Sequence, residues 1–240
     1  MTADRRPRGA ATAGSPRGEP ARRPEAVVLD MDGTLLDTEP VAARAWFVAA
    51  RTIGVDFDPA LPHRLIGRTF TDCRALIAAA HDDRYPVDAL MAGWHAAYDA
   101  IVEREGVALK PGAIDLVEWL AAEGIARAVA TSTRRARALV KLEHAALARH
   151  MHAIVGGDEV AFGKPAPDIF LATASRLGVA PARCVVIEDS TAGVAGAQAA
   201  GMAAIMVPDL VPPDAALRAT GVLVVETLAQ ARAHLAALPR

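Results

Sequence analysis

The chain has 240 residues, of which 52% are hydrophobic and 22% charged, a composition typical of a folded globular protein and not of a disordered one. Its length allows one large domain or a domain with an insert. No run of about 18 apolar residues is present, so we expect no membrane-spanning helix. The two cysteines, Cys73 and Cys184, lack metal or disulfide spacing, which favours a reduced, cytoplasmic location.

The formal net charge of −2 is distributed unevenly along the chain. Residues 1–24 contain six arginines against two acidic residues and carry +4, so residues 25–240 carry −6. An acidic folded part argues against nucleic acid as the main partner. The first 24 residues are rich in Pro, Gly, Ala and Arg and lack the apolar centre of a secretory signal, which predicts a disordered basic tail. No pattern sets the oligomeric state, for which a monomer is the default expectation.

Strands and helices are predicted to alternate along most of the chain. The continuous apolar run at residues 25–31 is typical of a strand buried on both faces of a parallel sheet. Similar runs follow at residues 126–130, 153–155, 184–187, 203–207 and 221–225. Amphipathic stretches at residues 112–123, 170–177 and 193–200 predict helices between these strands. The alternation over residues 108–240 predicts an α/β fold with a doubly wound, Rossmann-like parallel sheet.

Residues 38–107 interrupt this alternation. Only helices are predicted there, over residues 40–52, 71–80 and 87–105, and the last has Leu90, Trp94, Ala97 and Ile101 at helical spacing on one face. An all-helical insert directly after the first strand predicts a second, smaller domain at residues 38–107. The α/β core is then split in sequence and formed by residues 25–37 and 108–240.

The strongest chemical signal follows the first strand, where Asp30 and Asp32 are separated by one residue and followed by a glycine. In open α/β sheets, ligands bind beyond the carboxyl ends of the strands. Two carboxylates so close repel each other unless a cation or a shared proton relieves them, and a divalent cation with oxygen ligands is the natural partner. The alternative without function is an Asx-type turn that closes the strand.

Three further polar motifs follow later strands. Thr131 and Ser132 come after the strand at residues 126–130, where a helix cap is the plain alternative. Lys164 lies in a Gly-Lys-Pro segment that lacks the first glycine and the Ser/Thr of a P-loop, and it is one of only three lysines in the chain. Its compact ammonium suits a point contact with phosphate. Glu188 and Asp189 follow the strand at residues 184–187, where a solvated turn is the alternative.

Taken in chain order, these four motifs resemble those of the haloacid dehalogenase-like (HAD) hydrolase superfamily, in particular its helical-cap (C1) subgroup of β-phosphoglucomutase-like and phosphoglycolate phosphatase-like enzymes. The resemblance covers about residues 25–210. It implies that Asp30 is a nucleophile that forms an aspartyl phosphate and that Asp32 is a general acid and base. It also implies that Thr131 and Ser132 bind the transferring phosphoryl group, and that Lys164 neutralises its charge.

The resemblance further implies a magnesium site, with Mg²⁺ as the expected cofactor. Asp30, Asp189 and the backbone carbonyl of Asp32 are the expected direct ligands, and Glu188 is expected to act through water. An oxygen-only ligand set that leaves room for several waters suits Mg²⁺.

The loop formed by Gly67, Arg68, Thr69 and Phe70 matches the substrate-specificity loop of these capped enzymes. Arg68 would then contact a second phosphate or a polyol, and Thr69 would contact a hydroxyl group. The alternative is an ordinary loop between two helices with a solvent-facing arginine, and the sequence does not separate the two interpretations.

The expected function is Mg²⁺-dependent hydrolysis of a small phosphomonoester, of the sugar or polyol phosphate type, with no nucleic acid or membrane partner. Asp32 favours phosphoryl transfer over dehalogenation, because a halide leaves without a proton. One alternative is a β-phosphoglucomutase-like mutase, which is weakened because Ala42 and Phe70 stand where those mutases carry a histidine and an arginine. A second alternative is a non-catalytic binder that retains the fold, although such a protein would be expected to lack one of the four charged motif residues.

Overall fold

A computed structural model describes residues 20–66, 68 and 70–240. Most of the predicted basic tail (residues 1–19) and the predicted cap-loop residues Gly67 and Thr69 lie outside the described residues. At the amino end of the described chain, the backbone N–H of Arg23 donates to the carbonyl of Pro239 at 2.9 Å, and the Arg23 side chain pairs with Glu123. Contacts with the core therefore begin before residue 25, where the sequence placed the first packed element.

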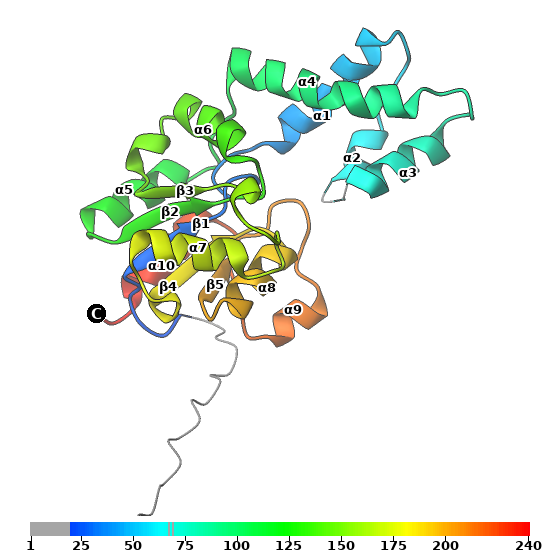
Figure 1. Ribbon diagram of the computed structural model, residues 1–240. Helices are drawn as coiled ribbons and strands as arrows, with labels where there is room; N and C mark the ends of the chain where they lie inside the picture. Colours follow the sequence, from blue (N-terminus) through cyan, green and yellow to red (C-terminus); the bar gives the residue numbers. More distant parts are fainter. Residues whose placement is uncertain (1–19, 67, 69) are drawn as a thin grey trace, which may run out of the picture.

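The centre of the described chain is a six-stranded sheet in the order β3-β2-β1-β4-β5-β6, with every neighbouring pair parallel (Figure 1). From β1 at the centre, the chain adds β2 and β3 on one side of the sheet and then β4, β5 and β6 on the other. This order confirms the predicted doubly wound α/β fold. The strands are β1 (Ala26–Leu29), β2 (Ala126–Ala130), β3 (Ala153–Val155), β4 (Cys184–Glu188), β5 (Ala203–Met206) and β6 (Leu223–Val224).

Helices make up most of the remaining described chain. They are α1 (Glu39–Thr52), α2 (Leu61–Leu65), α3 (Phe70–Ala80), α4 (Val87–Glu105), α5 (Ala113–Ala122), α6 (Arg135–His144), α7 (Asp168–Leu177), α8 (Thr191–Ala199), α9 (Ala215–Ala219) and α10 (Leu228–Ala237), with short 3-10 turns at Ala148–His150, Gly157–Glu159 and Pro181–Arg183. None of the described helices combines the length and hydropathy needed to cross a bilayer.

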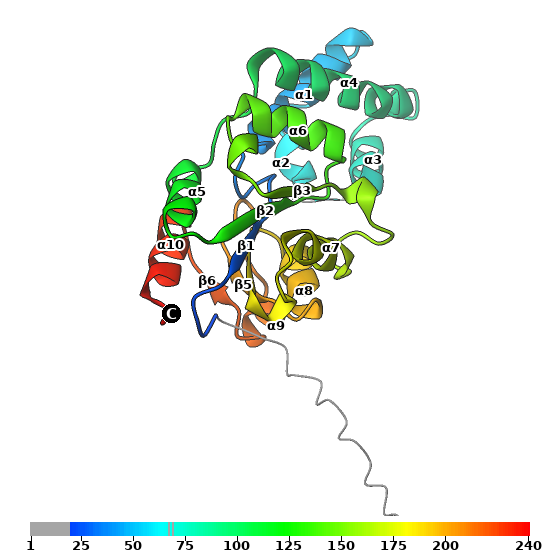
Figure 2. The same cartoon turned by 60° about the vertical axis from the view of Figure 1, so that its left-hand side comes forward.

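Helices cover both faces of the sheet. Figure 2 shows α5 and α10 on one side of the sheet and α7 and α8 on the other. The alternating side chains of β1 accordingly enter two different apolar clusters: Val27 and Leu29 pack on the side of α5 and α10, and Ala26 and Val28 pack on the side of α7 and α8. All four are inaccessible to solvent, which explains why the strand is a continuous apolar run.

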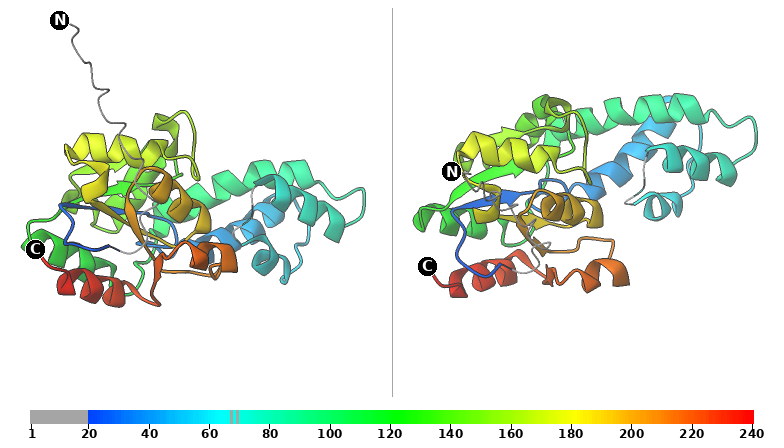
Figure 3. Two further views of the ribbon diagram at one scale, coloured as in Figure 1. Left: turned by 90° about the horizontal axis from the view of Figure 1, so that it is seen from below. Right: turned by 60° about the horizontal axis from the view of Figure 1, so that its bottom comes forward.

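The helices α1 to α4 lie apart from the sheet and its covering helices (Figure 3). Here α1 packs along α4, and aromatic side chains fill the contact, with the rings of Trp46 and Trp94 centred 5.2 Å apart. The two segments that join this helical group to the sheet follow β1 and precede α5. The helical group is therefore attached next to the residues that directly follow β1.

Candidate active site

The candidate site lies at the carboxyl ends of three neighbouring strands. Because β1 pairs with β2 on one side and with β4 on the other, the residues that follow these strands meet at one edge of the sheet. Asp30 and Asp32 follow β1, Thr131 follows β2, and Glu188 ends β4 with Asp189 directly after it. The structure thus brings together three of the four predicted motifs through the sheet alone.

Lys164 completes the group from the loop before α7. Its Nζ atom donates to Asp30 Oδ1 at 2.5 Å and to Glu188 Oε1 at 2.7 Å. All three residues are buried, since the Asp30 and Glu188 residues are 5% and 1% exposed and the Lys164 side chain is 6% exposed. A lysine buried to this extent is stable only when its charge is paired, and the two carboxylates supply that pairing.

The buried carboxyl groups have strongly altered acidity. Burial raises the pKa of Asp30 to about 7, against the lowering effect of the nearby Lys164 ammonium. Burial also raises the pKa of Asp189 to about 9, and the Asp30 and Glu188 carboxylates reinforce that increase. Although burial by itself would lower the pKa of Lys164, the same two carboxylates raise it, so the ammonium stays charged. The site therefore holds more negative charge than one lysine relieves, and a cation would stabilise it.

Two glycines allow these carboxylates to come so close to the backbone. Gly33 has a positive φ of +87°, and a Cβ atom added there would lie 2.5 Å from Asp189 Oδ2. A Cβ atom at Gly193, in the first turn of α8, would lie 1.8 Å from Glu188 Oε1. Any larger residue at either position would displace a carboxylate, so the glycines form part of the acidic site.

The acidic residues fit a divalent cation. One carboxylate oxygen from each of Asp30, Glu188 and Asp189 lies within 4.8 Å of the others, and an all-oxygen donor set of this kind suits Mg²⁺. The Glu188 oxygens also accept other hydrogen bonds: Oε1 from Lys164, and Oε2 from the backbone N–H and hydroxyl of Ser190. Asp30 and Asp189 are therefore better suited than Glu188 to direct coordination.

Asp32 faces a different set of partners, on the side of β2 and α6. Its Oδ1 atom accepts a hydrogen bond from Lys141 Nζ at 2.7 Å, and its Oδ2 atom accepts one from Thr133 Oγ1 at 2.6 Å. The Thr131 hydroxyl lies 3.4 Å from the same Oδ2 atom and accepts from the Thr133 backbone N–H at 3.1 Å. Sequence reasoning missed Lys141 and Thr133, although the rarity of lysine in this chain was an available signal.

A cavity of about 630 Å³ whose lining residues are mostly of polar types opens beside Asp32. It runs between the strand ends and the helices α1 and α4, and it is lined by Asp32, Thr38, Glu39, Ala42, Trp94, His95, Tyr98, Ser132, Thr133, Arg134, Arg137 and Lys141. Ser132, the predicted phosphoryl-binding residue, lies at the wall of this cavity together with the second aspartate. Arg68 and Phe70 do not line this cavity.

Arg68 and Phe70 line a second, mostly apolar cavity of about 790 Å³ among the helices α1 to α3. Phe70 is the first residue of α3 and is 42% exposed, and Arg68 Nε donates to the carbonyl of Arg64 at 2.9 Å. At the other end of this cavity, Lys110 Nζ pairs with Asp209 Oδ1 at 2.6 Å. Sequence analysis singled out neither of these two residues, which follow no recognisable motif.

Comparison with known proteins identifies the class. The model of the haloacid dehalogenase-like hydrolase family matches residues 24–201, and the chain belongs to this family. It is 34% identical over 188 residues to the fructose-1-phosphate phosphatase YqaB of Escherichia coli K12, which covers 75% of this chain and 94% of that protein. It is 33% identical over 213 residues to the β-phosphoglucomutase of Bacillus subtilis, with 85% and 93% covered.

Two further comparisons define the limits of the similarity. The chain is 34% identical over 185 residues to the bifunctional riboflavin kinase/FMN phosphatase of Arabidopsis thaliana, but the match spans only about half (48%) of that protein. Among solved structures, a HAD family hydrolase from Deinococcus radiodurans R1 with bound phosphate and sodium superposes with a TM-score of 0.70 at 31% identity, covering 95% of this chain and 100% of that one. Within the family, the chain is accordingly a phosphoric monoester hydrolase.

Proposed function

We propose that this chain is a Mg²⁺-dependent phosphatase that hydrolyses a small sugar or polyol phosphate through an aspartyl phosphate on Asp30. The observation that carries the proposal is the pairing of the buried Asp30 with Lys164 beside two further carboxylates at the strand ends. A carboxylate can attack phosphorus without a separate base, and a lysine beside it offsets the charge that repels an incoming phosphate dianion.

In the first step, a carboxylate oxygen of Asp30 forms a bond with phosphorus, and the bond from phosphorus to the leaving-group oxygen breaks. Protonated Asp32 donates its proton to that oxygen, so the leaving group departs as a neutral alcohol. The Thr131 hydroxyl and the Ser132 backbone N–H, which follow β2, are the proposed hydrogen-bond donors to the phosphoryl oxygens, since the Thr131 backbone N–H already donates to the carbonyl of Val155. The Lys164 ammonium balances the negative charge of the phosphoryl group.

In the second step, Asp32 acts as a base. It accepts a proton from a water molecule, whose oxygen forms a bond with phosphorus while the bond between phosphorus and Asp30 breaks. Inorganic phosphate leaves, and the proton that Asp32 has gained restores the acid for the next turnover. One carboxyl group can serve both steps because each step leaves it in the protonation state that the other needs.

Mg²⁺ bound beside Asp30 would supply positive charge to the phosphoryl oxygens. Asp30, Asp189 and the backbone carbonyl of Asp32 are the groups that would hold it, with Glu188 acting through water. The fit of the acidic cluster to an oxygen-binding dication supports this assignment.

The proposed substrate class follows from the cavity beside Asp32. Its walls offer hydroxyl, imidazole and guanidinium groups, from Ser132, Tyr98, His95 and Arg134, which suit the several hydroxyl groups of a sugar or polyol. Fructose-1-phosphate phosphatase among the relatives supports the same class. For the cell, we propose a cytoplasmic enzyme, and the two free, buried cysteines are compatible with a reducing compartment.

The mutase alternative is favoured by the similarity to β-phosphoglucomutase. It is weakened by Ala42 and Phe70, which replace the histidine and arginine expected in such mutases. Phosphorus NMR on a hexose 1-phosphate with its bisphosphate present separates the two activities, because a phosphatase yields inorganic phosphate and a mutase yields the isomeric hexose phosphate.

The proposed function is tested by measuring phosphate release from a panel of sugar, polyol, nucleotide and flavin monophosphates. Asp30→Asn should lower turnover at least about a thousandfold, because the amide cannot form the acyl phosphate. The exposed Asp115 of α5 offers a matched control, since Asp115→Asn makes the same chemical change at a carboxylate that lines neither cavity and is not part of the acidic cluster. Phosphate release by Asp30→Asn at the wild-type rate would refute the assigned nucleophile, and a wild-type chain inactive on the whole panel would favour the non-catalytic binder.

A further inference from the structure

Lys141 is a buried lysine for which the catalytic steps above give no role. It lies on α6, is only 5% exposed, and donates to Asp32 Oδ1 at 2.7 Å. We propose that Lys141 is a positioning residue that holds the Asp32 carboxyl group in the orientation from which it exchanges protons with the leaving group and water. This inference rests on the proposed function of Asp32 as the acid and base.

The cost of burying Lys141 is the first argument. Its ammonium group is compensated by two neighbours: Nζ lies 2.7 Å from Asp32 Oδ1 and 4.8 Å from the centre of the Tyr98 ring. A charge in this place is expensive, and a leucine or methionine would fill the same face of α6 beside Leu142 without that expense. The structure therefore retains the ammonium group for the contact with Asp32 and not for the stability of the helix.

The second argument is that Asp32 is held from two sides. Thr133 Oγ1 binds the Oδ2 atom at 2.6 Å and Lys141 Nζ binds the Oδ1 atom. Both partners follow β2: Thr133 lies in the loop before α6, and Lys141 lies on α6. Two charged or polar contacts on different oxygens restrict rotation about the carboxylate, whereas a single contact would leave it free to turn.

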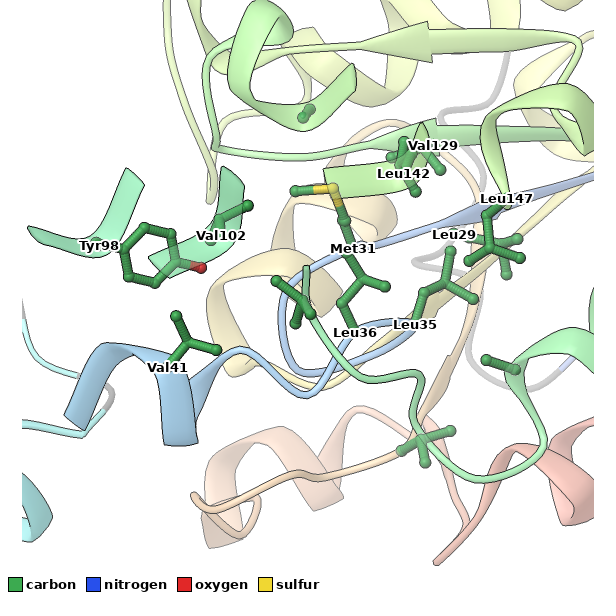
Figure 4. Close-up of a cluster of buried hydrophobic side chains, with 14 of the residues drawn as sticks. Leu29, Met31, Leu35, Leu36, Val41, Tyr98, Val102, Val129, Leu142 and Leu147 are labelled. Atoms are coloured by element: carbon green, nitrogen blue, oxygen red, sulfur yellow. The ribbon is translucent and has the colours of Figure 1, made fainter. Parts of the chain in front are cut away.

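The third argument is the link between Lys141 and the cap helices. The Lys141 ammonium lies 4.8 Å from the centre of the Tyr98 ring of α4, a cation–π contact. One turn earlier on α6, Arg137 pairs with Asp99 of α4 at 2.6 Å. Figure 4 shows Leu142, the neighbour of Lys141, in a cluster of buried side chains that also contains Tyr98 and Met31, the residue between Asp30 and Asp32 in sequence.

These contacts place Lys141 where α4, α6 and the loop after β1 meet. A cap helix that shifts relative to the sheet would change the environment of the lysine, and through it the orientation of Asp32. The orientation of the Asp32 carboxyl group therefore depends on the cap helices as well as on the core. The Lys141 ammonium group connects Asp32 to both.

The test compares substrates whose leaving groups do and do not need a proton. An alkyl or sugar leaving group needs a proton when its bond to phosphorus breaks, whereas nitrophenolate is a stable anion and departs without one. In Lys141→Met, we expect kcat for a polyol phosphate to fall about 30- to 100-fold with KM changed less than about threefold. With p-nitrophenyl phosphate, the first equivalent of nitrophenolate should still appear in a burst close to the wild-type rate, and later turnovers should be slow because water still needs Asp32.

A purely structural role gives a different result. If the burst slows by the same factor as the polyol phosphate turnover, or if Lys141→Met keeps wild-type kcat, the proposal is overturned. Lys141→Gln, which keeps a polar donor of similar length, provides a second variant in case Lys141→Met does not fold, and it should show a smaller kcat loss with the same preserved burst. Arg176→Met, which removes an exposed arginine of α7 and its ion pair with Glu159, is the control for loss of a surface charge.

A double-mutant cycle supplies the remaining evidence. In an Asp32→Asn background, Lys141→Met should cause no further loss of kcat, because the group that it positions is already inactive. Additive losses would overturn the proposal. Absence of phosphate release by the wild-type chain would overturn the proposed function together with this inference, whereas an active wild type with an unaffected Lys141→Met variant would overturn the inference alone.

Discussion

The Nζ atom of Lys164 lies 2.5 Å from the Oδ1 atom of Asp30, although 134 residues separate the two in sequence. The same ammonium donates to Glu188 and lies 5.4 Å from the centre of the Phe170 ring. The Lys164 ammonium compensates the charges of two buried carboxylates, Asp30 and Glu188, at the ends of the adjacent strands β1 and β4. Its removal should therefore affect both the stability of the core and the chemistry of the site.

In Lys164→Met, we expect the free energy of unfolding in the absence of Mg²⁺ to fall by about 3–5 kcal/mol, because breaking a buried ion pair leaves an uncompensated charge. Turnover should fall at least about a hundredfold. Urea denaturation and phosphate release measure the two effects. Arg176→Met removes an exposed ion pair and should cost less than about 1 kcal/mol. A loss in Lys164→Met no larger than that of this control would contradict the assigned role.

Magnesium should stabilise the folded chain more strongly at high pH. The pKa values of Asp30 (about 7) and Asp189 (about 9) exceed the ordinary value of 3.8, so the metal-free folded chain binds protons that the unfolded chain has already released. The stability that these groups contribute is complete below about pH 4 and is lost as the pH rises through 7 and 9. In EDTA, the melting temperature should accordingly decrease from about pH 6 to about pH 9.

Thermal unfolding with and without Mg²⁺ at these two pH values measures this effect. The increase in melting temperature on adding Mg²⁺ should be larger at about pH 9, where the carboxylates are ionised and repel one another. Asp189→Asn should remove most of the increase, and turnover should stop in EDTA and return with Mg²⁺. An equal increase at both pH values, or none, would count against a metal bound by these aspartates.

The sequence predicted the sheet and the four motifs because both depend on local patterns. Every strand is a short, mainly apolar run, and the polar motifs lie at strand ends that a parallel sheet brings together at one edge. It did not predict α6, in which five of the ten residues are apolar but only Ala138 and Leu142 among these are buried, together with the charged Lys141. Without that helix, the contact of Lys141 with Asp32 could not be anticipated, since it joins residues 109 positions apart.

The cap illustrates a second limit of sequence reasoning. Three of its helices were predicted from the sequence and the short α2 was not. The position of its specificity residues depends on how α1 to α4 pack against one another and against the core. Arg68 and Phe70 line the apolar cavity and not the cavity beside Asp32. The Lys110–Asp209 pair at the far end of that apolar cavity is likewise a product of tertiary packing, because the two residues are 99 positions apart.

Two glycines with the same backbone conformation allow strain to be separated from contact with the acidic cluster. Gly33 and Gly124 both have a positive φ, of +87° and +69°, but only Gly33 has a carboxylate in the place that a Cβ atom would occupy. Nothing lies within 4 Å of that place at Gly124. Substitution by alanine at either position should cost about 1–2 kcal/mol of stability from the left-handed backbone conformation.

Gly33→Ala should have a further effect that Gly124→Ala lacks. The new methyl group would displace the Asp189 carboxylate, so we expect the Mg²⁺ concentration for half-maximal activity to rise roughly tenfold or more, as for other changes that disturb the orientation of a metal ligand. A magnesium titration of activity for both variants, with urea denaturation to match their stabilities, measures this difference. Displacement of a ligand must weaken the binding of the cation. If the two variants lost stability equally and needed the same magnesium concentration, Asp189 would therefore not be a ligand that Gly33 keeps in position.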